Sequence, residues 1–401
     1  MNISKEILDL SKKSFGKLSN LTKKRFLYEE LTAELTSKSI TILSGPRGVG
    51  KSTLLKQVLE KFPDAFYLAV DLLEHDASLF DYAQELEEKY KIKYLIFDEI
   101  HFNENYVQDL KKIYDFLDLK IFTTSSVSIS LKNAAHDLSR RAKVFNLYPF
   151  SFREFIYFEK DILLEELSIS NILKKKWSAS HAKYYHLFHE YLKGRLFAFT
   201  LEEARYEVLF KSMLEKIINQ DIAKIGDLTF NEIKLIEKIV AFIAKSGSDG
   251  VSYNAISKNL GITIYKTQEY LNYLEQAYVI HILFPKGKNV TKEPKVLMFL
   301  PYRLLFCRFE DCIGALREDF VILALHSRGM STVHYLKSLR GEKVPDFIIE
   351  TENDKEVIIE VGGKGKGTSQ FKGIKNVEKY ILADSEEWKE NQIPLFMLGM
   401  N

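Results

Sequence analysis

Five short apolar runs alternate with longer amphipathic stretches in the first part of the chain. Each run has the length of a buried β-strand and is rich in Ile, Val, Phe and Tyr, whereas the stretches between the runs have the apolar spacing of helices. Strands that alternate with helices predict a parallel sheet with helices on both faces, a three-layer α/β fold. The runs cover residues 39–45, 66–73, 93–100, 119–126 and 143–150.

The pattern changes on both sides of this region. Residues before it have charged helical spacing, and helical spacing continues after Pro149. A break rich in Gly, Ser and Asp is followed by two short helices, at 252–260 and 264–277, and two strands, at 279–284 and 296–300, which is the element order of a winged helix. The predicted domains are a helical lead-in at 1–38, an α/β core at 39–155, a helical region at 156–245, a winged helix at 246–300 and a second α/β domain at 301–401.

Composition and charge narrow the class of protein. With 401 residues, 46% of them apolar and 28% charged, the chain is long enough for two or three hydrophobic cores. Its only cysteines, Cys307 and Cys312, are too few for a disulfide framework or a four-cysteine zinc site. We therefore expect the protein to be located in the reducing cytoplasm. No stretch is as long as a membrane span and the start lacks the apolar core of a signal peptide, so no membrane partner is expected. A net charge of +2 gives no general attraction to nucleic acid, so such binding requires a local patch.

A glycine-rich segment follows the first predicted strand and precedes a helix expected at 53–61. Its sequence, GPRGVGKS, matches the pattern G-x-x-x-x-G-K-[ST]. The glycines let the backbone wrap around phosphates, and the N–H groups at the helix N-terminus point toward the anion. We therefore predict that Lys51 contacts the β- and γ-phosphates of a nucleotide and that Ser52 binds Mg²⁺. The predicted nucleotide-binding residues are Gly45, Pro46, Arg47, Gly48, Val49, Gly50, Lys51, Ser52 and Thr53.

The carboxylates that such a site also requires come at the end of the third apolar run. Asp98 is expected to hold Mg²⁺ together with Ser52, and Glu99 is expected to act as general base toward the attacking water. A strand that ends in Asp-Glu is common by itself, but the glycine-rich segment about 50 residues earlier favours the catalytic interpretation. His101 either orients this site or packs against the sheet.

Two further polar groups are candidates for contact with the γ-phosphate. The fourth run ends in a Ser/Thr cluster, and either Thr124 or Ser125 reaches the phosphate or the cluster caps the next helix. Arg141, ahead of Arg140, is either a phosphate-neutralising arginine, often supplied by a neighbouring subunit, or part of a solvated pair. The chain lacks an Asn-Lys-x-Asp segment that would recognise guanine, so ATP is the predicted nucleotide.

Together these segments resemble the prokaryotic AAA+ ATPases that have a C-terminal domain of unknown function. The resemblance lies in GPRGVGKST, YLIFDEIH, FTTSS and SRRAKVFNLYPFSFREF, the last of which closes the ATPase core. It continues through Asn219-Gln220-Asp221-Ile222 and the winged helix, and it is weaker after residue 300. The resemblance implies ATP hydrolysis and self-association, but no particular biological role.

The predicted winged helix has two candidate kinds of partner. The helix expected at 264–277 has one basic residue, Lys266, against Glu269 and Glu275. This is a poor face for DNA, because phosphate contacts supply most of the affinity of DNA-binding proteins. The loop between the two strands is more basic, so DNA contact and a protein-docking role both remain open. Its lysines are Lys286, Lys288, Lys292 and Lys295.

Acidic residues in the last domain have the arrangement of a second metal site. A hairpin with its turn near Asn353 would place Asp346 opposite Glu360, and Glu318 lies on a preceding helix. This resembles the restriction-endonuclease-like fold, in which such carboxylates gather around Mg²⁺ beside a lysine. The resemblance implies a metal site at Glu318, Asp346 and Glu360.

The sequence departs from that pattern at the lysine. Its position is Gly362, and only Lys364 or Lys366 in the following loop is available to replace it. A metal nuclease and a catalytically silent binding domain both remain open, and the missing lysine favours the silent domain. The lysines of this region form either a patch for nucleic acid or a solvated face; they are Lys364, Lys366, Lys372, Lys375 and Lys379.

The leading hypothesis is an ATPase whose Mg²⁺-dependent turnover changes the conformation of C-terminal DNA- or protein-binding domains. The first alternative is a slow, nucleotide-gated regulatory binding protein, against which the presence of Glu99 argues. The second alternative is an ATP-controlled nuclease, against which Gly362 argues.

Overall fold

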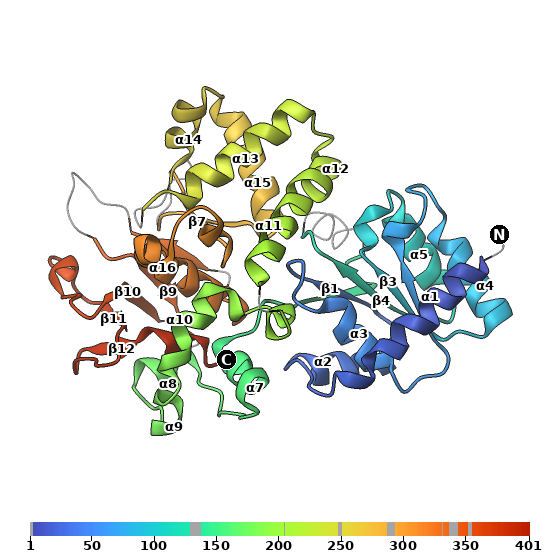
Figure 1. The fold of residues 1–401 in the computed structure, drawn as a ribbon, viewed down its shortest axis with the longest axis horizontal. Coiled ribbons are helices and arrows are strands. Elements are labelled where there is room, and N and C mark those ends of the chain that lie inside the picture. Colours follow the sequence, from blue (N-terminus) through green and yellow to red (C-terminus); the bar gives the residue numbers. More distant parts are fainter. Residues whose placement is uncertain are drawn as a thin grey trace. The chain divides into compact units, whose positions relative to one another are not determined.

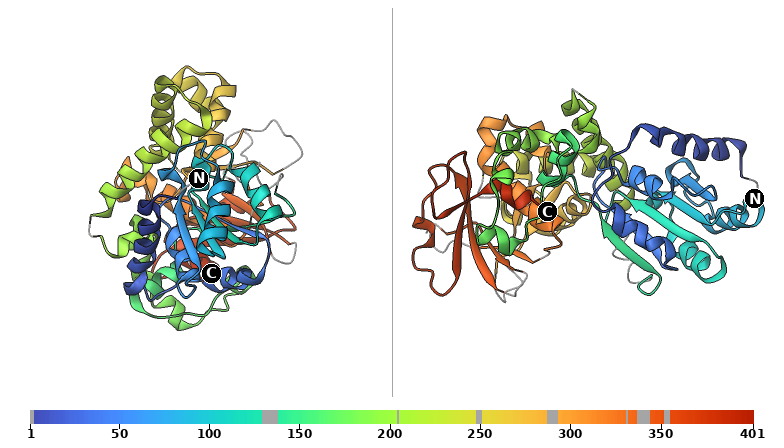
Figure 2. Two further views of the ribbon diagram at one scale, coloured as in Figure 1. Left: turned by 90° about the vertical axis from the view of Figure 1, so that its right-hand side faces the viewer. Right: turned by 90° about the horizontal axis from the view of Figure 1, so that it is seen from below.

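In the computed structural model the chain divides into two units, Met1–Pro149 and Phe150–Asn401 (Figures 1 and 2). The structure describes residues 3–128, 138–203, 205–247, 251–286, 293–330, 332–336, 344–351 and 355–401. The predicted lead-in at 1–38 belongs to the first unit. Within the described ranges, no helix is both long enough and apolar enough to cross a bilayer.

A five-stranded parallel sheet forms the centre of the first unit (Figure 1). The strand order is β2-β3-β4-β1-β5, and all neighbouring pairs are parallel. The five apolar runs are thus confirmed as strands. β1 and β4 are buried along their whole length, which explains why their sequences do not alternate with polar residues. The strands are β1 Ile40–Ser44, β2 Ala65–Ala69, β3 Tyr94–Asp98, β4 Lys120–Ser125 and β5 Ala142–Asn146.

Helices cover both faces of this sheet. Phe66 and Leu68 of β2 share a core with α4 and α5, whereas the ring of Tyr67 between them lies against Lys56 of α3. Because successive strand residues point to opposite faces, α3 lies on one face and α4 and α5 on the other. The dark blue α1 in Figure 2 runs along the outside of the unit and packs beside β2. These helices are α1 Lys5–Gly16, α2 Tyr28–Ala33, α3 Lys51–Leu59, α4 Leu79–Tyr90 and α5 Tyr106–Phe116.

The second unit begins with helices and ends with a mixed sheet. The sheet order is β12-β11-β10-β9-β8, with antiparallel pairs on the β8 side and parallel pairs on the β12 side. Its strands are β8 Val333–Tyr335, β9 Phe347–Glu350, β10 Glu356–Gly363, β11 Glu378–Asp384 and β12 Gln392–Pro394, and α16 Phe309–Ser327 packs on β10. The earlier helices are α7 Phe152–Lys160, α8 Ile169–Leu173, α9 Ala179–Ala182, α10 Phe188–Glu190, α11 Tyr206–Lys216, α12 Ala223–Gly226 and α13 Phe230–Ala244.

Two helices and a two-stranded antiparallel sheet lie between these parts, at the predicted positions. They are α14 Tyr253–Leu260, α15 Ile264–Gln276, β6 Ile280–Leu283 and β7 Lys295–Met298. The side chains of Ser252 and Thr263 accept hydrogen bonds from the first turns of α14 and α15, and Gly261 ends α14 with a left-handed φ of 65°. These local signals explain the boundaries, while the assignment as a winged helix stays a prediction.

A buried ion pair joins this segment to α16. The guanidinium of Arg303 donates to both carboxylate oxygens of Asp319, at 2.6 and 3.0 Å, and to the carbonyl oxygen of Ala244 at 2.9 Å. Asp319 also accepts from the N–H of Met298 at 3.0 Å. Arg303 therefore donates to a carbonyl group at the C-terminal end of α13 and links this helix to α16 through Asp319. Asp319 in turn binds the backbone of β7.

We predict that Arg303→Ala lowers the free energy of unfolding of the second unit by about 3–5 kcal/mol, because it leaves Asp319 as an uncompensated buried charge. Both tryptophans, Trp177 and Trp388, lie in this unit, so urea unfolding followed by tryptophan fluorescence measures it. Arg308→Ala, which removes an exposed ion pair with Asp311, is the matched control and should change little. Equal unfolding midpoints for the two variants would contradict this account.

Candidate functional site

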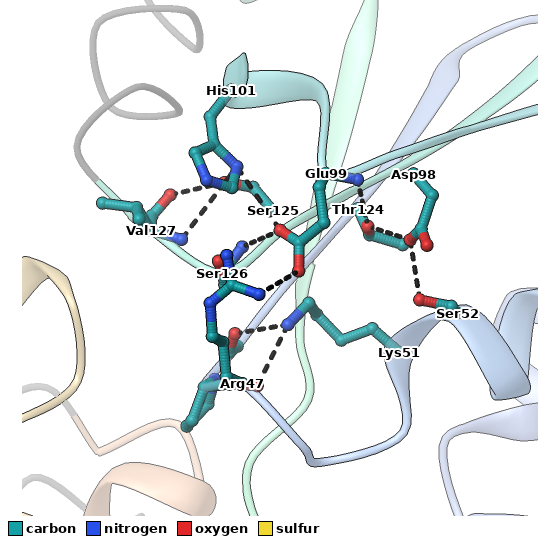
Figure 3. A network of polar contacts seen from close by, with 12 residues as sticks. Arg47, Lys51, Ser52, Asp98, Glu99, His101, Thr124, Ser125, Ser126 and Val127 are labelled. Carbon is teal, nitrogen blue, oxygen red and sulfur yellow. Dashed lines mark hydrogen bonds and ion pairs between the residues drawn. The ribbon is translucent and has the colours of Figure 1, made fainter. Parts of the chain in front are cut away.

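Three strands bring the predicted site together at one edge of the first sheet. β1, β3 and β4 are parallel neighbours, so their carboxyl ends lie at the same edge. β1 leads into the glycine-rich loop, β3 ends at Asp98, and β4 ends with Thr124 and Ser125. Figure 3 shows these side chains converging in front of the start of α3.

The glycine-rich loop surrounds the end of the Lys51 side chain (Figure 3). Gly48 and Gly50 have φ values of 79° and 95°, in the left-handed region that glycine adopts without strain. The ammonium of Lys51 donates to the carbonyl oxygens of Gly45 at 2.8 Å and Pro46 at 3.0 Å. Because α3 begins at Lys51, the loop combines a cation with a helix N-terminus, the arrangement that binds phosphate groups.

Arg25 fixes the outside of this loop, and the sequence analysis missed it. Its buried guanidinium donates to the carbonyl oxygens of Val49 at 2.6 Å and Tyr148 at 2.8 Å. Gly45 is confined in a similar way, because a Cβ there would lie 2.1 Å from the carbonyl oxygen of Leu147. The loop is thus held between the lead-in and the segment that follows β5.

Asp98 accepts hydrogen bonds from three hydroxyl groups. Its Oδ1 accepts from Ser52 at 2.7 Å and Thr124 at 2.5 Å, and its Oδ2 accepts from Tyr67 at 2.5 Å. Oxygen ligands of this kind suit Mg²⁺, so the residues present fit the predicted site in which Ser52 and Asp98 hold the ion. Burial and the charge of Asp98 raise the pKa of Tyr67, which keeps its hydroxyl a proton donor.

The carboxylate of Glu99 has partners from three segments (Figure 3). Its backbone has a φ of 51°, an uncommon value outside glycine, and its N–H donates to Thr124 at 2.9 Å. The carboxylate accepts from the N–H of Ser126 at 3.1 Å, lies 3.8 Å from the guanidinium of Arg47 and lies 3.4 Å from Nδ1 of His101. These contacts place an acidic oxygen beside the glycine-rich loop, where a general base for ATP hydrolysis would be needed.

The two predicted phosphate sensors have different partners. The Thr124 hydroxyl lies between the Asp98 carboxylate and the backbone of Glu99. The Ser125 hydroxyl donates instead to the carbonyl oxygen of Val127 at 2.8 Å and lies 3.3 Å from Nδ1 of His101. The structure therefore brings Thr124 to the acidic pair. The segment that either residue would cap includes 129–137, which lies outside the described residues.

Arg141 is the one predicted site residue that lies at the opposite edge of the sheet. It directly precedes β5, and the amino ends of parallel strands lie away from the glycine-rich loop. Its guanidinium forms a two-point ion pair with Asp115, at 3.0 and 2.9 Å, and Arg140 is exposed. This ion pair agrees with the alternative of a solvated pair and places Arg141 away from the nucleotide site of its own chain, while a role toward the site of a neighbouring copy stays a prediction.

The acidic residues of the second unit approach one another. The antiparallel register pairs Phe347 with Ile359, so Asp346 comes beside Glu360 as predicted. Burial, together with the charge of Asp346, raises the pKa of Glu318 to about 8 and that of Glu360 to about 7. The sequence thus identified neighbours in space from the length of a hairpin.

Two lysines, however, pair with these carboxylates. Lys295 contacts Glu318 and Lys366 contacts Glu360, each at 2.5 Å. Lys366 passes over Gly362, where a Cβ would lie 2.6 Å from its Cδ, so the glycine makes room for the displaced lysine. Among the described residues, no three His, Cys, Asp or Glu side chains are placed to hold a metal ion. The expected second metal site is not assembled, because ammonium groups already neutralise two of its carboxylates.

The basic residues expected to contact DNA are largely engaged elsewhere. Lys266 pairs with Glu232 at 2.8 Å and with Glu269 at 3.4 Å, so acidic groups balance its charge. Its neighbour Tyr265 is instead 74% exposed. Few of the lysines predicted in the loop between the strands are available to DNA. Lys295 is buried and pairs with Glu318 of α16. The remaining loop lysines are Lys286, which pairs with Glu356, and Lys288 and Lys292, which lie outside the described residues.

Two segments match sequence families. Residues 37–156 match a family described as an AAA domain, and residues 195–299 match a domain of unknown function, DUF8612. The first match begins before β1 and ends within α7, so it contains the whole parallel sheet, the glycine-rich loop and the acidic pair. Sheet, loop and family match together show that the first unit has an AAA-type P-loop NTPase fold.

Two relatives resemble most of the chain. The uncharacterized protein MJ1637 of Methanocaldococcus jannaschii is 28% identical over 93% of this chain and 88% of its own length. MJ1544 of the same organism is 26% identical over 90% of this chain and 82% of its own length. Among solved structures, the Walker-type ATPase PABY2304 of Pyrococcus abyssi is 15% identical, with a TM-score of 0.41, and covers 67% of this chain and 91% of its own.

We predict that Gly45→Ala weakens nucleotide binding and lowers the free energy of unfolding of the first unit by about 1–3 kcal/mol, because the new methyl group forces the loop away from Leu147. Gly16→Ala is the matched control, since a Cβ there meets no described atom within 4 Å. Affinity for a fluorescent ATP analogue and thermal unfolding followed by circular dichroism measure both effects. Unchanged affinity and stability in the Gly45 variant would show that the loop is not confined as described.

Proposed function

We propose that this protein is a Mg²⁺-dependent ATPase whose site is built by Gly45–Thr53 and the acidic pair of β3. The observation that supports this best is the Asp98 carboxylate bonded to the hydroxyl of Ser52, beside a glycine-rich loop that surrounds Lys51. Together these groups are the parts that phosphoryl transfer requires: a phosphate cradle, ligands for a metal ion and a base.

Each residue has a separate role in this proposal. The loop N–H groups and the Lys51 ammonium bind the phosphates, and Ser52 and Asp98 hold Mg²⁺. When bound, the ion neutralises charge on the phosphate oxygens. Glu99 orients the attacking water and accepts its proton, and Thr124 positions the carboxylate of Asp98 and the backbone of Glu99 through its two hydrogen bonds.

The arrangement around Glu99 favours turnover over slow nucleotide gating. A protein that only binds ATP has no need for a general base, yet the carboxylate of Glu99 is positioned by the Ser126 N–H and by Arg47. Positioning of this kind is required for proton transfer, which depends on geometry before it depends on pKa. We therefore favour the ATPase over the regulatory binding protein.

For the second unit we propose a protein-binding role without nuclease activity. The ion pairs of Lys266 with acidic residues make α15 a weak surface for phosphates, and exposed Tyr265 suits a protein partner better. The pairing of Lys295 with Glu318 and of Lys366 with Glu360 supports a catalytically silent version of the nuclease-like domain. ATP turnover would then act on a docked protein.

Glu99→Gln is expected to retain ATP binding and to lower kcat by roughly 10²–10⁴-fold, because the amide cannot accept the proton of water. Lys51→Ala should weaken ATP binding by roughly 10- to 100-fold, the loss of a charge-assisted hydrogen bond to phosphate. Steady-state phosphate release and titration with a fluorescent ATP analogue separate the two effects.

Glu104→Gln is the matched control, an exposed glutamate five positions further on in the same connection. It should leave turnover and binding unchanged. Normal ATP binding by the Lys51 variant would contradict the site, and a wild-type protein limited to a single turnover would favour the gated binding protein instead.

Duplex DNA should leave ATP turnover unchanged within roughly twofold and should not be cut in the presence of Mg²⁺, since Lys266, Lys286 and Lys366 of the second unit are held in ion pairs with carboxylates. The same reactions with Asp346→Ala serve as the control. A several-fold stimulation of turnover by DNA would restore the DNA-binding hypothesis. Mg²⁺-dependent cleavage that disappears in the Asp346 variant would restore the nuclease.

A further inference from the structure

A cleft of about 800 Å³ lies beside the candidate ATP site. It is bounded by α1 on one side and by the end of β2 and the chain that follows on the other. The carboxyl end of β2 belongs to the same sheet edge as the glycine-rich loop, the edge at which open α/β sheets bind ligands. Its volume lies in the range of small-molecule sites.

The lining of this cleft combines apolar and basic side chains. Leu68 and Leu72 contribute apolar surface, and Leu72 is 68% exposed at the rim. Lys13 of α1, Lys17 directly after α1 and Lys56 of α3 contribute three ammonium groups. Two carboxylates, Glu6 and Glu74, also line the cleft, so its excess charge is positive.

Lys56 is the most informative of these residues. Among the described side chains, no carboxylate forms an ion pair with it, and its ammonium instead lies 4.7 Å from the centre of the Tyr67 ring. Burial lowers the pKa of Lys56, the charge of Asp98 partly opposes this, and the charge of Lys17 lowers the pKa further. The hydroxyl of Ser14, which also lines the cleft, is buried without a hydrogen-bond partner among the described residues. These groups offer hydrogen bonds that an anion would accept.

Tyr67 connects this cleft to the ATP site. Its ring lines the cleft, while its hydroxyl donates to Oδ2 of Asp98 at 2.5 Å. Its backbone N–H donates to the hydroxyl of Ser11 on α1 at 3.0 Å. A molecule that moves α1 or the Tyr67 ring therefore acts directly on the carboxylate that is proposed to hold Mg²⁺.

We propose that the cleft binds a small organic anion with an apolar body and a phosphate or carboxylate head group, and that Tyr67 transmits its binding to Asp98. The head group lies near Lys17 and Lys56, and the apolar body lies against Leu68 and Leu72. The binding half stands independently of the ATPase, whereas the Tyr67 half rests on the proposed ATP hydrolysis.

Calorimetric titration of the full-length protein with octyl phosphate and with octanoate tests the binding half. We expect saturable binding of at least one of them, and the preferred one identifies the head group. The double variant Lys17→Glu/Lys56→Met should weaken binding roughly tenfold or more, because two charge-assisted contacts are lost. Lys12→Glu, an exposed lysine of α1 outside the cleft, should bind as the wild type does.

Lys51→Ala separates the cleft from the glycine-rich loop, and it should bind the octyl anion unchanged. Equal affinity of the wild type and the double lysine variant would overturn the binding site, as would loss of binding in the Lys51 variant. If the double variant folds poorly, single Lys17→Glu, a change at an exposed position, gives the same test.

ATP turnover at saturating octyl anion tests the connection. We expect a change of roughly two- to tenfold in the wild type and none in Tyr67→Phe, which should still bind the anion, because the ring remains and only its hydrogen bond to Asp98 is removed. An unchanged wild-type rate, or an equal response in the Tyr67 variant, would overturn the role of Tyr67. Absence of any ATP hydrolysis would contradict the proposed function and this role together, but not lysine-dependent binding.

Discussion

The carboxylate of Asp98 is the point on which the first unit is organised. It is buried at the edge of the sheet, and a buried carboxylate needs hydrogen-bond donors to offset its lost hydration. The donors are hydroxyls from α3, β2 and β4, which are Ser52, Tyr67 and Thr124. These contacts are possible because β3 lies between β2 and β4 and because α3 begins next to the carboxyl end of β3. The strand order and the position of the glycine-rich loop are therefore both consistent with this one set of interactions.

The two acidic sites of the chain illustrate how the donor decides what a carboxylate can do. Hydroxyl groups satisfy Asp98 without cancelling its charge, which leaves it able to attract a divalent cation. In the second unit, Glu318 and Glu360 instead form ion pairs with the ammonium groups of Lys295 and Lys366, which offset the negative charge. Both sites contain carboxylates at strand ends or on neighbouring elements, so position alone does not distinguish them. The chemistry of the partner does, and it favours phosphate chemistry only in the first unit.

The sequence predicted the parts of the site that depend on backbone conformation or on position at a strand end. The loop glycines and the Asp98-Glu99 pair were found because their spacing is dictated by local geometry. Tyr67 was missed because it lies inside an apolar run, and only the pairing of β2 with β3 brings it to Asp98. Arg25 was missed for a similar reason, since a basic residue in a charged helical lead-in has no local signal. For Arg141, position along the chain favours the solvated pair within one chain, because a residue that precedes a parallel strand lies at the amino ends of the strands, away from the loop.

The lead-in has a larger role than its charged sequence suggested. β2 is an edge strand, and an edge strand presents unpaired N–H groups that need to be covered. The Ser11 hydroxyl of α1 accepts from one of them, the N–H of Tyr67. The match to the AAA family begins only at residue 37, so α1 lies outside the matched segment. It nevertheless covers the edge strand of the sheet that this segment forms. An element that covers the edge strand of the sheet, adds lysines beside it and bonds Tyr67, a partner of the proposed Mg²⁺ ligand Asp98, is well placed to regulate the proposed reaction without taking part in it. The physical requirement to cover β2 thus explains why a regulatory cleft would form at this edge.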